Sequence, residues 1–267
     1  MSAAEITPNV EFTLADTEEE YTFPRSGCTL ECNEIEMQLS HIHRAAMTPP
    51  RAVIFDLDGL MFNTEDVYFE VGRQLMRRRG CEYSRQLNDA VMGRSPQDCF
   101  QTMIRWHALS DRWEAMAAES EDLFISLLDG YLAPLPGLLE LLDALETAGI
   151  PKAICTSSSR RDLTAVLARF HLEPRFRFTL TAEDITHSKP HPEIYLNAAA
   201  RLGLPAHEIL VLEDSQTGCR AAADAGTLVA AVPCEYSKNQ DFSAASLVLE
   251  SLADPRLYEL LGLQTAG

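Results

Sequence analysis

Two aspartates, Asp56 and Asp58, directly follow the short apolar run Ala52–Phe55. If that run is a strand of an open parallel sheet, its end points both carboxylates at the edge where ligands bind. Acidic residues also follow strands simply to cap a turn. Turn capping explains one aspartate better than it explains a D-x-D-G segment that continues to Thr64 and Glu65. The pair is therefore the first candidate for an active centre.

Hydroxyl groups and a lysine follow two later apolar runs. Ser157 and Ser158 offer hydroxyls and backbone amides suited to phosphoryl oxygens, although serine clusters more often form loops or helix N-caps. Lys189 lies in the segment Ser-Lys-Pro-His-Pro-Glu. A loop lysine is usually a solvated charge, but Pro190 and Pro192 favour a fixed backbone at this point.

Two adjacent carboxylates, Glu213 and Asp214, end the apolar run Ile209–Leu212. Side by side at the end of a buried strand they repel each other, and the arrangement is costly without a cation. Oxygen ligands of this kind bind hard metal ions. The pair therefore predicts a divalent cation site.

These groups all stand at the ends of short apolar runs that alternate with helical patterns, which is typical of βαβ units. We predict an α/β fold, a Rossmann-like parallel sheet core with helices on both faces. The predicted strands are Ala52–Phe55, Lys152–Thr156, Phe178–Leu180, Ile209–Leu212, Leu228–Val232 and Leu247–Leu249. Helices are expected at Leu138–Ala148, Ile194–Arg201 and Ala221–Ala225. A parallel sheet would gather the candidate groups at one edge.

The stretch between the first two predicted strands, residues 64–150, is far too long for one crossover helix. It is rich in helix formers, and its apolar residues have helical spacing. We assign residues 64–133 to an inserted all-α cap domain, and residues 51–63 and 134–267 to the core domain. The apolar positions that carry this prediction are Val67, Val71, Leu75, Leu123, Leu127 and Leu128.

Residues 1–50 contain nine acidic side chains against two arginines and no sustained apolar period, so we expect a poorly ordered acidic extension. Met47 precedes Thr48-Pro49-Pro50 and the first strand, which suggests the hypothesis that translation starts there. Four residues of the extension could supply zinc ligands, but their spacing matches neither usual finger pattern, and unpaired residues are the alternative. They are Cys28, Cys32, His41 and His43.

The formal charge of −18 over 267 residues would repel polyanions, so we expect no nucleic-acid partner. Apolar runs fall short of the roughly 18 residues of a membrane span, and the N-terminus lacks the layout of a signal peptide. Seven cysteines with scattered spacing favour reduced thiols over a disulfide framework. These features predict a cytoplasmic protein without a membrane partner, and we expect a monomer or a weak dimer.

The four chemical segments, taken in order and at these strand ends, resemble the four motifs of the haloacid dehalogenase superfamily over residues 51–240. They are D-x-D-G-x-x-x-x-T-E, the serine cluster, S-K-P-x-P and E-D-S. The inserted segment is similar to the helical C1 cap of the phosphatases and mutases near β-phosphoglucomutase. The resemblance implies a Mg²⁺-dependent hydrolase that acts on a small phosphorylated metabolite.

The resemblance also implies a role for each matching residue. Asp56 would attack phosphorus to form an aspartyl phosphate, and Asp58 would serve as general acid and then as general base. Mg²⁺ would lie between the Asp56 carboxylate, the backbone carbonyl of Asp58 and the Asp214 side chain, with Glu213 as a further ligand or as a partner of the ligands. The phosphoryl oxygens would be held by Ser157, the amide of Ser158 and Lys189. If the preceding strand ended one residue earlier, Thr156 would instead supply the hydroxyl of the second motif.

The predicted cap bears on the choice of substrate. Tyr68 stands where β-phosphoglucomutases usually carry a histidine, and Arg94 directly follows a glycine, with Pro96 where the mutase arginine would fall. Both departures favour a phosphatase acting on a small phosphomonoester such as a sugar phosphate, with a phosphosugar mutase as the alternative. Tyr68 could equally pack in the core. Dehalogenase chemistry is disfavoured because Asp58 and the acidic pair suit a cation rather than a halide.

Overall fold

The structure of this protein is a computed structural model, which describes residues 48–92 and 94–264. The described residues belong to one compact unit. Residues 1–47, which make up nearly all of the predicted acidic extension, lie outside the described residues. They include Met47 and the candidate zinc ligands Cys28, Cys32, His41 and His43.

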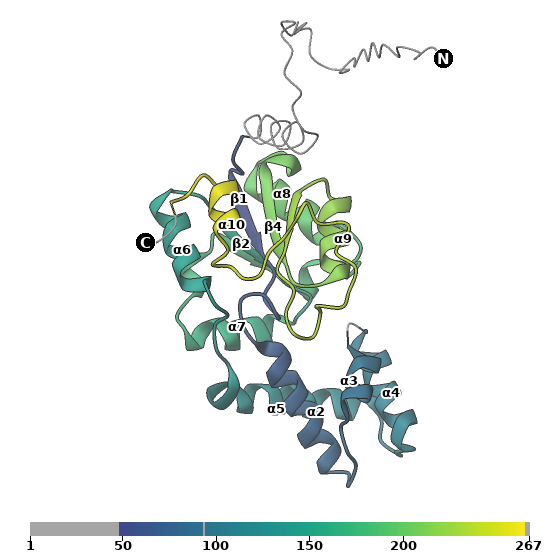
Figure 1. Ribbon diagram of the computed structural model, residues 1–267. Helices are drawn as coiled ribbons and strands as arrows, with labels where there is room; N and C mark the ends of the chain where they lie inside the picture. Colours follow the sequence, from purple (N-terminus) through teal and green to yellow (C-terminus); the bar gives the residue numbers. More distant parts are fainter. Residues whose placement is uncertain (1–47, 93, 265–267) are drawn as a thin grey trace, which may run out of the picture. The chain divides into compact units, whose positions relative to one another are not determined.

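Six parallel strands form one sheet in the order β3-β2-β1-β4-β5-β6, which confirms the predicted α/β class (Figure 1). Every residue of β1, β2 and β4 is buried, as expected for a parallel sheet with helices on both faces. The strands are β1 (Ala52–Phe55), β2 (Lys152–Cys155), β3 (Phe178–Leu180), β4 (Ile209–Glu213), β5 (Leu228–Ala231) and β6 (Leu247–Val248).

Several strand and helix ends differ by a few residues from the prediction. β2 ends at Cys155 rather than Thr156, because its ladder with β3 runs out at the pair Cys155–Leu180. β4 continues to Glu213, which still pairs with Ala231 of β5. β5 stops before Val232 and β6 before Leu249. The helix predicted at Ala221–Ala225 instead starts at Gln216, where the Ser215 side chain accepts a hydrogen bond from the Gly218 N–H and caps it.

Alternate residues of the strands contribute to two apolar cores, one on each face of the sheet. Val53 and Phe55 face the core formed with α6 (Leu138–Thr147), α7 (Arg160–Arg169) and α10 (Pro255–Leu260). Ala52 and Ile54 face the core formed with α8 (Glu193–Leu202) and α9 (Gln216–Asp224) (Figure 1). Short 3₁₀ turns occur at Glu173–Arg175, Ala182–Asp184 and Ala206–Glu208.

Four helices lie between β1 and α6, within the segment predicted to be the cap. They are α2 (Thr64–Arg77), α3 (Arg85–Val91), α4 (Pro96–His107) and α5 (Trp113–Tyr131). α2 and α5 run side by side, and their buried faces include Val67, Val71, Leu123 and Phe124 (Figure 1). We call these four the inserted helices. Among the described residues, none of the helices has the length and apolarity needed to cross a membrane.

The chain enters and leaves the inserted helices through two segments that pair with each other. The Asn63 N–H donates to the Ala133 carbonyl at 3.1 Å, and the Asn63 side-chain oxygen accepts the Ala133 N–H at 2.7 Å. Next to this pair, the Leu135 N–H donates to the Met61 carbonyl at 2.9 Å. The two crossings therefore form a short antiparallel ribbon rather than two independent linkers.

Candidate active site

The candidate residues meet at the carboxyl edge of the sheet. Phe55 of β1 is in register with Ile154 of β2 and Leu212 of β4, so these three strands end at nearly the same level. Asp56, Thr156 and Glu213 therefore emerge side by side, and Lys189 reaches them from the loop that precedes α8.

Lys189 holds the centre of the group. Its side chain is 6% exposed, and Nζ donates to Asp56 Oδ1 at 2.6 Å, to Glu213 Oε1 at 2.6 Å and to the Cys155 carbonyl at 3.1 Å. Burial alone would lower the pKa of Lys189, but Asp56 and Glu213 outweigh it and raise that pKa well above its usual value. Lys189 is therefore a fixed cation beside the Asp56 carboxylate.

Glu213 positions Lys189, and its own oxygens are fully engaged. Besides Lys189, Oε1 accepts the Tyr195 hydroxyl at 2.7 Å. Oε2 accepts the Ser215 hydroxyl at 2.9 Å and the Ser215 N–H at 3.3 Å. Of its two expected roles, metal ligand or partner of the ligands, this bonding fits the second, because few lone pairs remain for an ion.

The carboxylates form a set that suits a cation. One carboxylate oxygen from each of Asp56, Glu213 and Asp214 lies within 4.8 Å of the other two, and all three residues are buried. Burial raises the pKa of Asp56 to about 8; Lys189 opposes this change, while Glu213 and Asp58 add to it. Burial, then repulsion from Glu213 and Asp56, also raises the pKa of Asp214 well above its usual value. One lysine does not balance this charge, and buried oxygen ligands of this kind fit Mg²⁺.

Asp58 is held through one carboxylate oxygen, and its other oxygen has no partner in the described part of the chain. Its Oδ2 accepts the Thr156 hydroxyl at 3.1 Å and the Ser158 hydroxyl at 2.6 Å. Its Oδ1 is buried and has no hydrogen-bond partner among the described residues. A buried polar atom of this kind calls for a ligand or water. Gly59, with φ of 70°, turns the chain directly behind Asp58.

The two predicted phosphate-binding serines differ in their surroundings. Ser157 is exposed beyond the end of β2. Ser158 has partners within the protein, because its N–H donates to the Thr156 hydroxyl at 3.0 Å and its own hydroxyl donates to Asp58. Thr156, the alternative hydroxyl of the second motif, is fully buried and follows directly after the end of β2, where it donates to Asp58.

Of the two predicted cap residues, Tyr68 lies near the site and Arg94 lies apart from it. The Tyr68 ring stacks on Phe124 with 4.5 Å between ring centroids. Burial, and next the charge of Asp58, raises the pKa of Tyr68 well above its usual value, while a hydrogen bond with Ser158 opposes the rise. Arg94 is exposed between α3 and α4, and no side-chain contact in the described part of the chain joins it to Asp56 or Asp58.

Three further contributors were given no role of their own from the sequence, although one of them, Glu65, ends the first motif. Tyr195 falls on the apolar stripe of α8 and was not distinguishable from a core residue. Gly218 is a glycine in a small-residue helix, yet a Cβ built there would lie 1.8 Å from Glu213 Oε1. Glu65, in the first turn of α2, has its pKa raised to about 7 by burial and then by Asp58 and Asp66.

Known proteins are similar to this chain in sequence and in fold. Hexitol phosphatase B of Escherichia coli K12 is 30% identical over 226 residues, which cover 81% of this chain and all of that enzyme. The bifunctional riboflavin kinase/FMN phosphatase of Arabidopsis thaliana is 30% identical over 77% of this chain, but the chain spans only 54% of that relative. The crystal structure of a haloacid dehalogenase family hydrolase from Deinococcus radiodurans R1, with bound phosphate and sodium, is 27% identical. It has a TM-score of 0.68 and covers 82% of this chain and all of that one.

A family profile covers most of the chain and includes every residue of the carboxyl-edge cluster. The profile of the haloacid dehalogenase-like hydrolases matches residues 53–232, from β1 to the end of β5. The resemblance inferred from the four motifs is thereby confirmed, and so is the expectation that the protein is a hydrolase. This chain belongs to the haloacid dehalogenase-like hydrolases.

Proposed function

We propose that this hydrolase is a Mg²⁺-dependent phosphatase that transfers a phosphoryl group from a small phosphomonoester to Asp56 and then to water. The observation that carries the proposal is the position of Lys189, which is buried and bonded to both Asp56 and Glu213. A lysine cation beside the attacking carboxylate neutralises charge where a phosphoryl group would arrive. Splitting the displacement into two steps through an aspartyl phosphate makes each step easier.

Asp58 is proposed as the acid and base of the two steps. With a substrate bound, its unpartnered Oδ1 would protonate the leaving oxygen and later take a proton from the attacking water. The Thr156 and Ser158 hydroxyls hold the other oxygen of Asp58, so the carboxyl group is already oriented. Ser157, the Ser158 amide and Lys189 are proposed to hold the non-bridging phosphoryl oxygens, and the Ser158 N–H would exchange its bond to the Thr156 hydroxyl for one to the substrate.

The proposed Mg²⁺ ligands are the Asp56 and Asp214 side chains and the backbone carbonyl of Asp58. Glu213 would act through Lys189 and Ser215, since its own oxygens are engaged. Bound Mg²⁺ would neutralise the substrate charge and orient the phosphoryl group. The ion would also favour the ionised form of the buried carboxylates, which is the form that attacks phosphorus.

The proposed substrate is a sugar phosphate or a sugar-alcohol phosphate. The name of hexitol phosphatase B, which aligns over its whole length, supports this class. Tyr68 is proposed to contact the substrate, because it is close enough to the site to bond with Ser158. Arg94 is exposed between α3 and α4, and we propose that it contacts the substrate once the substrate is bound.

We also propose the domain boundaries, the oligomeric state and the cellular compartment that were predicted from the sequence. The inserted helices would be the cap (64–133), and residues 51–63 with 134–267 would be the core. A monomer or weak dimer in the cytoplasm is proposed. Five cysteines of the described residues are free thiols, which favours a reducing compartment.

The decisive experiment measures phosphate release from a panel of sugar and sugar-alcohol phosphates with Mg²⁺. Asp56→Asn should lower kcat by at least about 10³-fold, since loss of a nucleophile removes the covalent step. Asp224→Asn, on the exposed surface of α9, is the matched control and should keep wild-type turnover. Unchanged turnover in Asp56→Asn would end the proposal. Interconversion of glucose 1-phosphate and glucose 6-phosphate faster than phosphate release would instead identify a mutase.

A further inference from the structure

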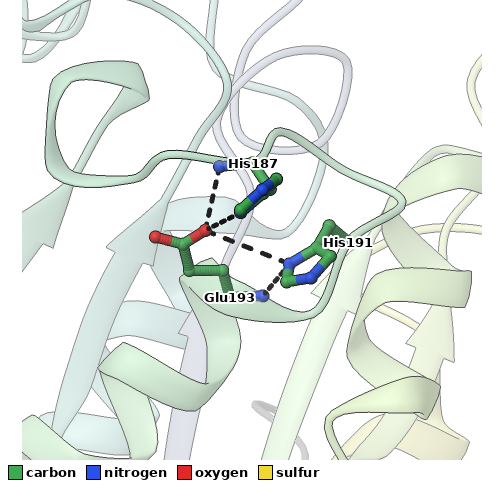
Figure 2. A group of neighbouring side chains, drawn as sticks. All are labelled: His187, His191 and Glu193. Atoms are coloured by element: carbon green, nitrogen blue, oxygen red, sulfur yellow. Dashed lines mark hydrogen bonds and ion pairs between the residues drawn. The ribbon is translucent and has the colours of Figure 1, made fainter.

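Two histidines and a glutamate gather on the loop that carries Lys189. His187 and His191 flank the lysine in sequence, and Glu193 begins α8 just beyond (Figure 2). A ligand atom from each of the three lies within 4.8 Å of the others. The group is separate from the buried cluster of Asp56, Glu213 and Asp214.

The three side chains already point toward one another. Glu193 Oε2 lies 2.9 Å from His187 Nδ1 and 4.0 Å from His191 Nδ1 (Figure 2). The two imidazole rings are 4.6 Å apart between centroids. Both rings are largely exposed, with 62% and 51% of the side chains accessible, so an ion in solution can reach them.

We propose that His187, His191 and Glu193 form a second metal site, which takes a transition-metal ion of the Zn²⁺ type. Imidazole nitrogens suit Zn²⁺, whereas Mg²⁺ prefers an all-oxygen set. Two histidines and one carboxylate supply three ligands of a tetrahedron, and water completes it. The chain would then separate two kinds of ion, a hard one at the buried carboxylates and a softer one on the loop.

The distances are close to those that such an ion requires. With Zn–N and Zn–O bonds of about 2.0–2.1 Å, the ligand atoms of a tetrahedral site lie about 3.3 Å apart. The 2.9 Å contact of His187 must therefore open slightly, and the 4.0 Å gap to His191 must close. Small rotations of the two exposed rings would make both changes, and the His191 ring would give up the hydrogen bond that its Nδ1 accepts from the Glu193 N–H at 3.3 Å.

Glu193 is prepared to serve as the fixed ligand. Its two oxygens accept the Thr186 and His187 N–H groups, each at 2.8 Å. These backbone hydrogen bonds, and then the His187 ring, lower the pKa of Glu193, which keeps it ionised. The same bonds anchor the carboxylate to the loop backbone, so only the rings need to move.

Occupancy of this site would tie down the loop on both sides of Lys189. Ligands at positions 187 and 191 lie on either side of the lysine, and Glu193 joins them to α8. The loop would therefore open less often when metal is bound, which amide hydrogen exchange of residues 186–193 reports directly. This effect is independent of the proposed phosphatase activity.

The test is a Zn²⁺ titration of the full-length protein by calorimetry, with Mg²⁺ saturating. His187→Gln and His191→Gln should each weaken one Zn²⁺ binding event by at least about tenfold. His207→Gln, an exposed histidine in the turn before β4, is the matched control and should bind as wild type. A Cys28→Ser/Cys32→Ser variant should also retain the event. Melting curves without zinc check that each variant is folded.

Two further measurements need no substitution. X-ray absorption of the protein with one equivalent of Zn²⁺ should show nitrogen and oxygen ligands including imidazole, and hydrogen exchange of residues 186–193 should slow. Zinc bound through sulfur, or equal affinity in the wild type and both histidine variants, would overturn the proposal. In that case the His187–Glu193 contact is only a hydrogen bond that braces the loop.

Discussion

Gly218 of α9 packs its α-carbon directly against the carboxylate of Glu213, with no room for a side chain between them. A Cβ built at Gly218 would lie 1.8 Å from Oε1 and 2.1 Å from Oε2. The same carboxylate holds Lys189 and Tyr195 through Oε1. The absence of one methyl group on a neighbouring helix therefore keeps the lysine in its place.

Gly218→Ala should lower the activity of the enzyme even though alanine is the better helix former. In an open helix the exchange would stabilise by about 1 kcal/mol. Here the methyl group must displace Glu213, so we expect kcat to fall at least about tenfold and the melting temperature to drop. Gly130→Ala, in α5 with nothing within 4 Å of the added Cβ, is the control and should keep wild-type activity. Normal kcat in Gly218→Ala would contradict this account.

Tyr195→Phe removes one of the two donors to Glu213 Oε1 without changing the packing of the ring. Because Glu213 is fully buried, the lost hydrogen bond should cost about 1–3 kcal/mol in unfolding free energy. We expect a several-fold lower kcat as well, since Lys189 loses part of its support. Urea unfolding and phosphate release measure the two effects. Tyr131→Phe, at an exposed tyrosine, should change neither.

Glu65 makes folding depend on pH. Its pKa is raised from 4.5 to about 7 in the folded chain, by burial first and then by Asp58 and Asp66. The folded protein keeps a proton that the unfolded protein has released, so stability falls as pH rises from about 4.5 to about 7 and then levels off.

Glu65→Gln should remove this dependence. Relative to wild type it should gain about 1–3 kcal/mol at pH 8 and little at pH 4.5. Urea unfolding at both pH values, in EDTA and again in Mg²⁺, provides the measurement. Glu82→Gln, at an exposed loop position, should track wild type throughout. A Glu65→Gln variant with the wild-type pH dependence would rule out this role.

Lys152 is a buried charge at the first residue of β2, and it is paired with Glu146. Its side chain is 3% exposed, and Nζ donates to Glu146 Oε1 at 2.7 Å. Glu146→Gln should therefore destabilise the fold by about 1–2 kcal/mol, less than for a fully buried pair because Glu146 is 44% exposed. Glu140→Gln, exposed on the same helix, is the control. We expect Glu146→Gln to lower the melting temperature and to leave kcat at low temperature at the wild-type value.

The fold could be predicted because β-branched runs and helical periods alternate so regularly. Strand ends were less accurate, since the end of β2 depends on how far β3 extends beside it. The site was predictable to the extent that it lies at strand ends, where Asp56 and Glu213 come directly after apolar runs. Lys189 was marked by its prolines.

Other contributors could not be predicted, because their roles depend on contacts between distant segments. Tyr195 occupies an apolar position of α8, and only the approach of β4 gives its hydroxyl a carboxylate to bond. Thr156 was open to two interpretations, the last residue of a strand or the hydroxyl of the second motif, and neither indicated that it would donate to Asp58, which is 98 residues earlier in the chain. Helical and strand periodicity describe which side chains are buried but not which polar groups meet.

The ribbon formed by Asn63 and Ala133 has a consequence for how this chain can change over time. Because the two ends of the insertion are hydrogen-bonded to each other, the insertion connects to the core in the way that a loop connects the two strands of a hairpin. The entropy cost of closing a loop grows only slowly with its length. We therefore expect that the inserted helices can be lengthened, shortened or exchanged without moving the residues at the sheet edge.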